Sequence, residues 1–183
     1  MKHFYENIHG WFDFDDIYKN MVEKAKDNWH FVEVGTWYGR SATYMAVEIE
    51  NSGKLIKFDC VDTWKGSEEH QNTDKNIIED GTIYPQFLQN IEPVKHIINP
   101  IKTTSIEAAK LYEDESLDFI FIDASHDYDN VKADIEAWFP KLKKHRIFAG
   151  HDYYWAGVKK AVDELFQDKK ILISKSSWMV VKE

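Results

Sequence analysis

The chain is short of the residues that hold small proteins together by cross-links. It contains one cysteine, Cys60, among 183 residues, so neither an internal disulfide nor a thiolate zinc cluster can form within one chain. Cys60 lies in an apolar run, and we expect an inert, buried thiol. No apolar run approaches the roughly 20 residues that cross a bilayer, and no apolar signal core follows the basic start at Lys2. We therefore expect a cytoplasmic protein with no membrane partner.

Positive charge is also scarce. Lysine and arginine number 23 against 32 acidic residues, which gives a formal net charge of -9. A phosphate backbone requires a basic footprint, so this balance argues against a nucleic-acid partner. The local basic group Lys141, Lys143, Lys144 and Arg146 is interpreted as a solvated turn. Eight glycines and four prolines form no linker, and we expect one domain over residues 1–183, with a helical segment at 1–28 and an α/β core at 29–183.

What the chain does contain is an alternation of short apolar runs with segments of helical period, which is typical of a parallel sheet covered by helices. Strands are expected at residues 31–34, 55–61, 94–98, 117–122 and 146–149. Helices are expected at 17–25, 42–49, 84–91, 105–112, 131–142 and 158–166. A polar stretch at 65–81 predicts loop and short helix, and residues 171–174 and 178–181 predict a hairpin. The fold class is α/β: a doubly wound, mostly parallel sheet with a C-terminal antiparallel hairpin.

Polar residues stand where the predicted strands end, and ligands of open α/β sheets bind beyond those ends. Residues 33–41 read EVGTWYGRS, a strand that runs into a glycine turn and then a helix, whose N–H groups favour negative charge. Only Gly35 and Gly39 are present, where the dinucleotide motif has three glycines. The turn therefore suits a ligand without pyrophosphate, for instance one with a carboxylate. A tight turn with no ligand is the alternative.

Asp62 ends the second predicted strand, 27 residues after Gly35. A carboxylate in this position can accept hydrogen bonds from both hydroxyls of an unphosphorylated ribose. A helix or turn cap would explain it equally. Taken together with the glycine turn, Asp62 favours a ligand that contains adenosine.

Four segments together, VEVGTWYGRS, VDTW, FIDASHDYDNVKADIEAW and GHDY, resemble the class I S-adenosylmethionine-dependent methyltransferases. The resemblance is narrower to the small bacterial and viral branch labelled methyltransferase family 24, and it covers about residues 31–166. One departure lies before the fifth strand, where the family's Lys-Pro-Gly-Gly turn is replaced by Lys143, Lys144, His145 and Arg146.

The resemblance implies a set of roles around S-adenosylmethionine. Glu33 and Gly35 would cradle its methionine end, with Thr36, Gly39 and Ser41 in the turn and at the helix start. Asp62 would hold the ribose, Trp64 would pack near the adenosine, Ser105 and Ile106 would border the adenine, and Asp123 would face the transferred methyl group.

Asp123, His126, His151 and Asp152 lie at or beyond the ends of two strands expected to be neighbours, and they are the candidate catalytic residues. Asp123 and Asp152 suit a divalent cation such as Mg²⁺, which in related O-methyltransferases acidifies a substrate hydroxyl. A metal-free site with His126 or His151 as the base is the alternative, and so are plain helix caps.

We therefore expect methyl transfer to a hydroxyl of a small molecule, of sugar or phenol type, bordered by residues 10–12 and 67–89. Two other functions stay open. One is a nicotinamide-dependent oxidoreductase, because its fold shares a glycine turn and a ribose-binding acid. The other is a non-catalytic domain that binds the cofactor.

Overall fold

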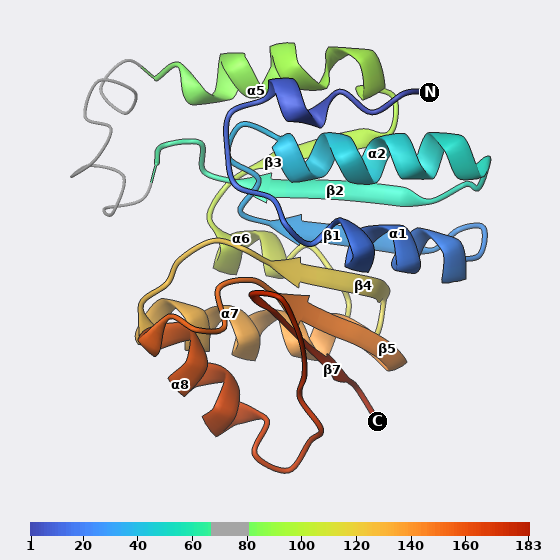
Figure 1. Ribbon diagram of the computed structural model, residues 1–183. Helices are drawn as coiled ribbons and strands as arrows, with labels where there is room; N and C mark the ends of the chain where they lie inside the picture. Colours follow the sequence, from blue (N-terminus) through green and yellow to red (C-terminus); the bar gives the residue numbers. More distant parts are fainter. Residues whose placement is uncertain (67–80) are drawn as a thin grey trace.

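The computed structural model describes residues 1–66 and 81–183, which form a sheet of seven strands with helices on both faces (Figure 1). The strand order is β3-β2-β1-β4-β5-β7-β6. The strands are β1 (His30–Val34), β2 (Lys57–Asp62), β3 (Ile98–Lys102), β4 (Leu117–Ile122), β5 (Leu142–Gly150), β6 (Leu172–Ser174) and β7 (Ser177–Val181). The first five run parallel, whereas β7 is antiparallel to both β5 and β6. The predicted doubly wound sheet with a C-terminal hairpin is confirmed.

Two layers of helices cover the sheet. One layer holds α1 (Asp15–Lys24), α2 (Arg40–Ser52) and α5 (Ile83–Ile91), and the other holds α6 (Ser105–Ala109), α7 (Tyr128–Trp138) and α8 (Ala156–Leu165). The described residues also include three short 3-10 helices: η1 (Tyr5–Asn7), η2 (Glu92–Val94) and η3 (Phe139–Lys141). No helix in these two described ranges has the length and apolar character needed to span a membrane.

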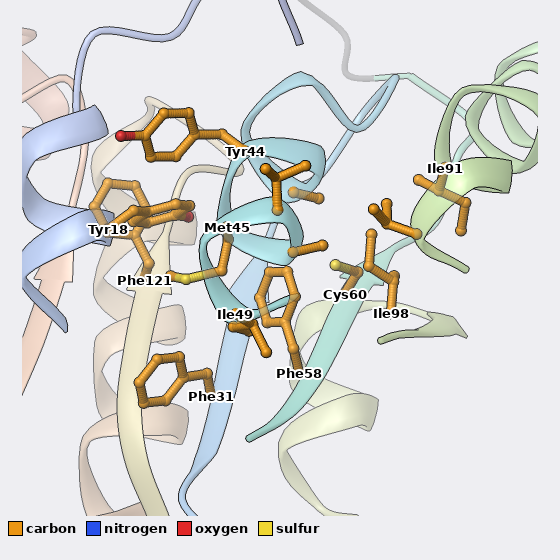
Figure 2. Packing of buried hydrophobic residues seen from close by; sticks show 14 of the residues in the cluster. Tyr18, Phe31, Tyr44, Met45, Ile49, Phe58, Cys60, Ile91, Ile98 and Phe121 are labelled. Atoms are coloured by element: carbon orange, nitrogen blue, oxygen red, sulfur yellow. The ribbon is translucent and has the colours of Figure 1, made fainter. Parts of the chain in front are cut away.

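Alternation along each strand divides the core between the two layers. In β1, Phe31 packs with the α1 and α2 cluster, whereas Val32 packs with the α6, α7 and α8 cluster. Figure 2 shows the first cluster, where Met45 and Ile49 of α2 lie among aromatic rings from α1 and the strands. Cys60 is fully buried here, as predicted. By the same alternation, Glu33 points to the face that α1 and α2 cover.

Several boundaries of helices and strands follow from local features of the chain. All six residues of β4 are buried, as its unbroken apolar run predicts. Gly53 ends α2 in the left-handed region, with φ 66°. Asp127 caps α7 by accepting a hydrogen bond from the backbone N–H of Asn130 at 3.0 Å.

Other predicted boundaries are wrong. β2 begins at Lys57 rather than at 55, and Leu55 is 72% exposed. The strand expected at 94–98 is instead the end of η2 and a turn, and β3 begins only at Ile98. Pro100 lies inside β3, which is tolerated because β3 is an edge strand. The helix expected at 105–112 ends at Ala109. The polar stretch expected at 65–81 falls mostly on residues 67–80, outside the described residues.

The basic group before the predicted fifth strand is not a solvated turn. Lys143 and Arg146 belong to β5, and both bind Asp118 of β4, at 2.8 Å from Nζ to Oδ2 and 3.1 Å from Nε to Oδ1. The Asp118 side chain is almost fully buried. A buried carboxylate requires such partners, so the segment that replaces the family's glycine turn pairs a charge across the sheet.

Candidate functional site

The order in which the chain adds strands to the sheet reverses between β1 and β4, which are neighbours. The helix after β1 covers one face and the helix after β4 covers the other, which makes this the switch point where ligands of such folds bind. Gly35 follows β1 with φ 88°, and a β-carbon there would lie 2.0 Å from the backbone oxygen of Asp123. Only glycine fits at this contact. The predicted cofactor turn and the predicted methyl-facing residue therefore meet at one point.

The Asp62 carboxylate holds the glycine turn in place. Its Oδ2 accepts the backbone N–H groups of Thr36 at 3.0 Å and Trp37 at 2.8 Å, and its Oδ1 accepts that of Trp64 at 2.7 Å. Trp37 and Trp64 both have positive φ, 44° and 50°, a strained backbone that these bonds stabilise. Burial raises the pKa of Asp62 against the lowering effect of these amides. Asp62 thus orders the turn in addition to any role toward a ribose.

Glu33 is buried at 1% exposure beneath the turn. Its Oε2 accepts a hydrogen bond from the Tyr18 hydroxyl at 2.8 Å, and its Oε1 accepts one from the Ser41 hydroxyl at 2.6 Å. Burial raises the pKa of Glu33 to about 8, despite these two donors. Tyr18 was not among the predicted site residues, because its place in a helical apolar pattern indicated only core packing.

The start of α2 ties the N-terminal segment to the turn. Gly39 precedes α2 with φ 82°, and a β-carbon there would lie 3.0 Å from the Phe87 ring. Arg40, the first residue of α2, donates from NH1 to the backbone oxygens of Ile8 at 3.2 Å and Gly10 at 2.8 Å. No local pattern predicts this contact, because it joins residues some 30 positions apart.

The four candidate catalytic residues do come together. Asp152 Oδ2 lies 2.9 Å from His126 Nε2 and 3.2 Å from His151 Nδ1, and Asp123 Oδ1 lies 3.8 Å from His151 Nδ1. A fifth residue, Asp13, joins them with its Oδ1 at 2.9 Å from His151 Nε2. Asp13 was missed because nothing local in the sequence marks a contact with a residue so far along the chain.

Burial and the neighbouring charges shift the pKa values of three groups in this polar cluster in different directions. Burial alone would lower the pKa of His151, but the hydrogen bond to Asp152 and the charge of Asp123 raise it to about 9. Burial likewise opposes ionisation of Asp152, yet its bonds to His126 and His151 hold its pKa well below the usual range. Burial raises the pKa of Asp123 to about 6. At neutral pH, His151 is therefore a cation between carboxylates, and Asp123 titrates close to the working range of an enzyme.

Part of this cluster has the donors of a metal site. Ligand atoms of Asp123, His126 and Asp152 all lie within 4.8 Å of one another. Two carboxylates and one imidazole form a mixed oxygen and nitrogen set, which suits Mn²⁺ or another transition ion at least as well as Mg²⁺. The residues fit a divalent cation, provided that it replaces the bonds that Asp152 makes with the imidazoles.

Three residues were expected to contact the adenosine: Trp64, Ser105 and Ile106. Trp64 is 3% exposed, packs against Tyr84 and Phe87, and donates from its indole N–H to the backbone oxygen of Trp37 at 2.8 Å. The Ser105 hydroxyl donates to Asp134 Oδ1 and accepts from Trp138 Nε1, which joins α6 to α7. Ile106 is exposed on α6. Trp64 and Ser105 thus have structural partners, whereas Ile106 faces solvent.

Comparison with known proteins agrees with this geometry. A family model described as a methyltransferase domain matches residues 32–153. An uncharacterised protein, y4gI, of Sinorhizobium fredii is 31% identical over 121 residues, which are 66% of this chain and 13% of that relative. The chain thus spans only about an eighth of that relative's length.

Solved structures show the same fold. A Staphylococcus aureus protein provisionally described as a caffeoyl-CoA O-methyltransferase superposes with a TM-score of 0.69 at 16% identity, covering 97% of this chain and 87% of that one. The O-methyltransferase NovP superposes with a TM-score of 0.67 at 12% identity, covering 92% and 78%. With the family match over most of the sheet, the chain belongs to the methyltransferase domain family, family 24 of the class I S-adenosylmethionine-dependent methyltransferases.

Proposed function

We propose that this chain transfers the methyl group of S-adenosylmethionine to a hydroxyl oxygen of a small-molecule acceptor. The observation that carries the proposal is the contact between Gly35 and Asp123 at the switch point, beside the cluster of His126, His151 and Asp152. It brings a ligand-binding turn next to groups that can move a proton. Family membership favours methyl transfer over hydride transfer.

The cofactor would lie over the turn that Asp62 orders. Glu33, between Tyr18 and Ser41, would face the ammonium of the methionine end, and a nearby cation would favour its ionised form. Backbone groups of Gly35, Thr36 and Gly39 would approach the ligand closely, because no β-carbon stands in the way at the two glycines. Asp62 Oδ1 accepts one backbone bond and retains a lone pair for a ribose hydroxyl.

Bound S-adenosylmethionine would supply an electrophilic methyl carbon. Asp123, at the end of β4, would accept the proton of the acceptor hydroxyl as its oxygen attacks, and a carboxyl with a pKa of about 6 is a better base than an ordinary one. Asp152 holds the imidazoles of His126 and His151 in place. Most of the rate would come from positioning the two reactants in line.

A divalent cation is the alternative to a free carboxylate base in this proposal. Asp123, His126 and Asp152 would hold it, and it would supply Lewis-acid acidification of the acceptor hydroxyl. The acceptor itself is proposed to be a sugar or a phenol, and the reaction is proposed to take place in the cytoplasm.

Calorimetric titration with S-adenosylhomocysteine tests the cofactor site. Asp62→Asn should weaken binding at least about tenfold, because an amide cannot accept all three backbone N–H groups of the turn. Asp59→Asn is the matched control on the same strand: Asp59 binds His30, Tyr112 and Asn99 instead, and its variant should bind like the wild type. Absence of binding by the wild type would overturn the proposal. Binding without release of S-adenosylhomocysteine from S-adenosylmethionine on any hydroxyl acceptor would favour a non-catalytic domain.

A further inference from the structure

Exposed aromatic side chains gather beside the polar cluster. Among the described residues, the large aromatic side chains that stand out in solvent are Trp11 at 73%, Tyr154 at 69% and Trp155 at 53% exposure. Trp11 lies two positions before Asp13, and the other two follow Asp152 directly in the sequence. Covering an exposed indole removes a large apolar area from water, which is favourable, so exposed aromatic rings mark binding surfaces.

Trp11 is held firmly despite its exposure. Arg40 binds the backbone oxygen of Gly10 on one side, and His151 binds the Asp13 carboxylate on the other. The Trp11 ring stacks on Trp37, with centroids 5.7 Å apart and planes 9° from parallel. Since Trp37 belongs to the cofactor turn, Trp11 presents a fixed flat surface directly beside that turn.

Trp155 stands on the other side of the cluster. Its ring stacks on His126 with centroids 4.5 Å apart, and its backbone N–H donates to the backbone oxygen of Asp152 at 2.9 Å. Trp11 lies close to the same cluster, because two residues of chain span at most about 7 Å and Asp13, two positions later, binds the His151 imidazole. Two exposed indoles therefore flank one group of carboxylates and imidazoles.

This combination matches a particular ligand chemistry. A pyranose ring has apolar C–H faces that pack on an indole, and hydroxyls around its rim that donate to carboxylates. Asp13, Asp123 and Asp152 offer several such acceptors, whereas a simple phenol has one hydroxyl to donate. The three carboxylates outnumber the His151 imidazolium between them, so the cluster repels a phosphate or carboxylate on the ligand and favours an uncharged molecule over an anionic one.

We propose that Trp11 and Trp155 form the acceptor platform, on which an uncharged hexopyranosyl ring stacks with one hydroxyl turned toward Asp123. The inference rests on the proposed function and deepens it by choosing a neutral sugar over a phenol. Trp11, which lies beside the cofactor turn, takes the reacting ring, and Trp155 contacts the substituent or the next ring.

Saturation-transfer NMR tests this on the whole chain with saturating S-adenosylhomocysteine. The probes are neutral methyl pyranosides of the gluco, galacto, manno and rhamno series, with catechol as the phenol. Transfer should reach the C–H protons of at least one pyranoside, and Trp11→Ala should reduce that affinity about tenfold. Trp11→Phe should retain part of it. Leu55→Ala, which changes an equally exposed side chain at 72% before β2, should change nothing.

The outcomes separate the two proposals. Transfer to catechol but to no pyranoside, or pyranoside binding that survives Trp11→Ala unchanged, would overturn the platform while S-adenosylhomocysteine binding leaves the methyltransferase proposal standing. Silence of the whole pyranoside panel would also overturn it. Loss of S-adenosylhomocysteine binding in the wild type would instead defeat the proposed function.

Discussion

The hydroxyl of Tyr18 donates a hydrogen bond to Glu33 Oε2 at 2.8 Å, which joins α1 to the carboxyl end of β1. Tyr18 is fully buried, so water does not compete for this hydrogen bond. Helix α1 thereby becomes part of the proposed cofactor site, because it sets the position and the charge state of the carboxyl group that would face the methionine end.

Tyr18→Phe removes this donor and leaves a buried carboxyl oxygen with one partner fewer. We expect a loss of roughly 1 to 3 kcal/mol in the free energy of unfolding, measured by urea denaturation, together with weaker S-adenosylhomocysteine binding. Tyr44→Phe is the control, since the described residues show no hydrogen bond for the Tyr44 hydroxyl. Equal stability of the two variants would contradict the role of Tyr18.

Glu33→Gln should alter how stability depends on pH. A group whose folded pKa is raised from 4.5 to about 8 contributes stability that is complete below pH 4.5 and is lost as the pH rises toward 8. The wild type should therefore lose at most about 1.4 kcal/mol per pH unit from this group in that window. Thermal unfolding from pH 5 to pH 8.5 should show a flatter curve for the variant. Parallel curves would show that Glu33 is already ionised in the folded protein.

Gly35→Ala should disrupt the switch point, because its β-carbon would lie 2.0 Å from the Asp123 backbone oxygen. We expect a loss of about 3 kcal/mol or more and no detectable S-adenosylhomocysteine binding. Gly53→Ala is a matched control: Gly53 also has positive φ, but nothing lies within 4 Å of its missing β-carbon. That variant should lose about 1 kcal/mol and bind normally. Normal binding by Gly35→Ala would mean that the turn can move without consequence.

Asp13→Asn should lower the pKa of His151. In the folded protein this pKa is raised to about 9, so the stabilisation that His151 contributes is complete below its ordinary value of 6.5 and is lost as the pH rises to 9. A histidine NMR titration should show the lowered pKa in the variant. Glu50→Gln, which removes the carboxylate beside the distant His96, should leave the His151 titration unchanged. A pKa unaffected by Asp13→Asn would argue that Asp13 and His151 do not pair in solution.

The sequence alone predicts the elements whose signals are local. The unbroken apolar run of β4 required no knowledge of the rest of the chain. β3 was misplaced because Pro100 argues against a strand unless the strand lies at an edge, which only the full sheet reveals. Lys143 and Arg146 were misinterpreted for a similar reason, since their partner Asp118 lies on a different strand.

The candidate site divides in the same way. Residues at strand ends, such as Asp123 and Asp152, could be identified because the fold class fixes where strand ends meet. The residues that hold them, Tyr18, Arg40 and Asp13, could not, because each acts through one contact with a distant part of the chain. Asp62 shows the intermediate case: its position was predicted and a turn cap was one of its two expected roles, but its bonds to Thr36 and Trp37 in the separate turn after β1 were not predicted.

The bond between Asp13 and His151 joins residues 138 positions apart, and this has a consequence for the order in which the protein assembles during synthesis. A growing chain that has emerged only as far as β2 already holds Asp62 and the turn it orders. The cluster at the other side stays incomplete until β5 has joined the sheet and delivered His151. A nascent chain therefore contains the glycine turn and Asp62 well before it contains the whole cluster, which is complete only after β5 has been made.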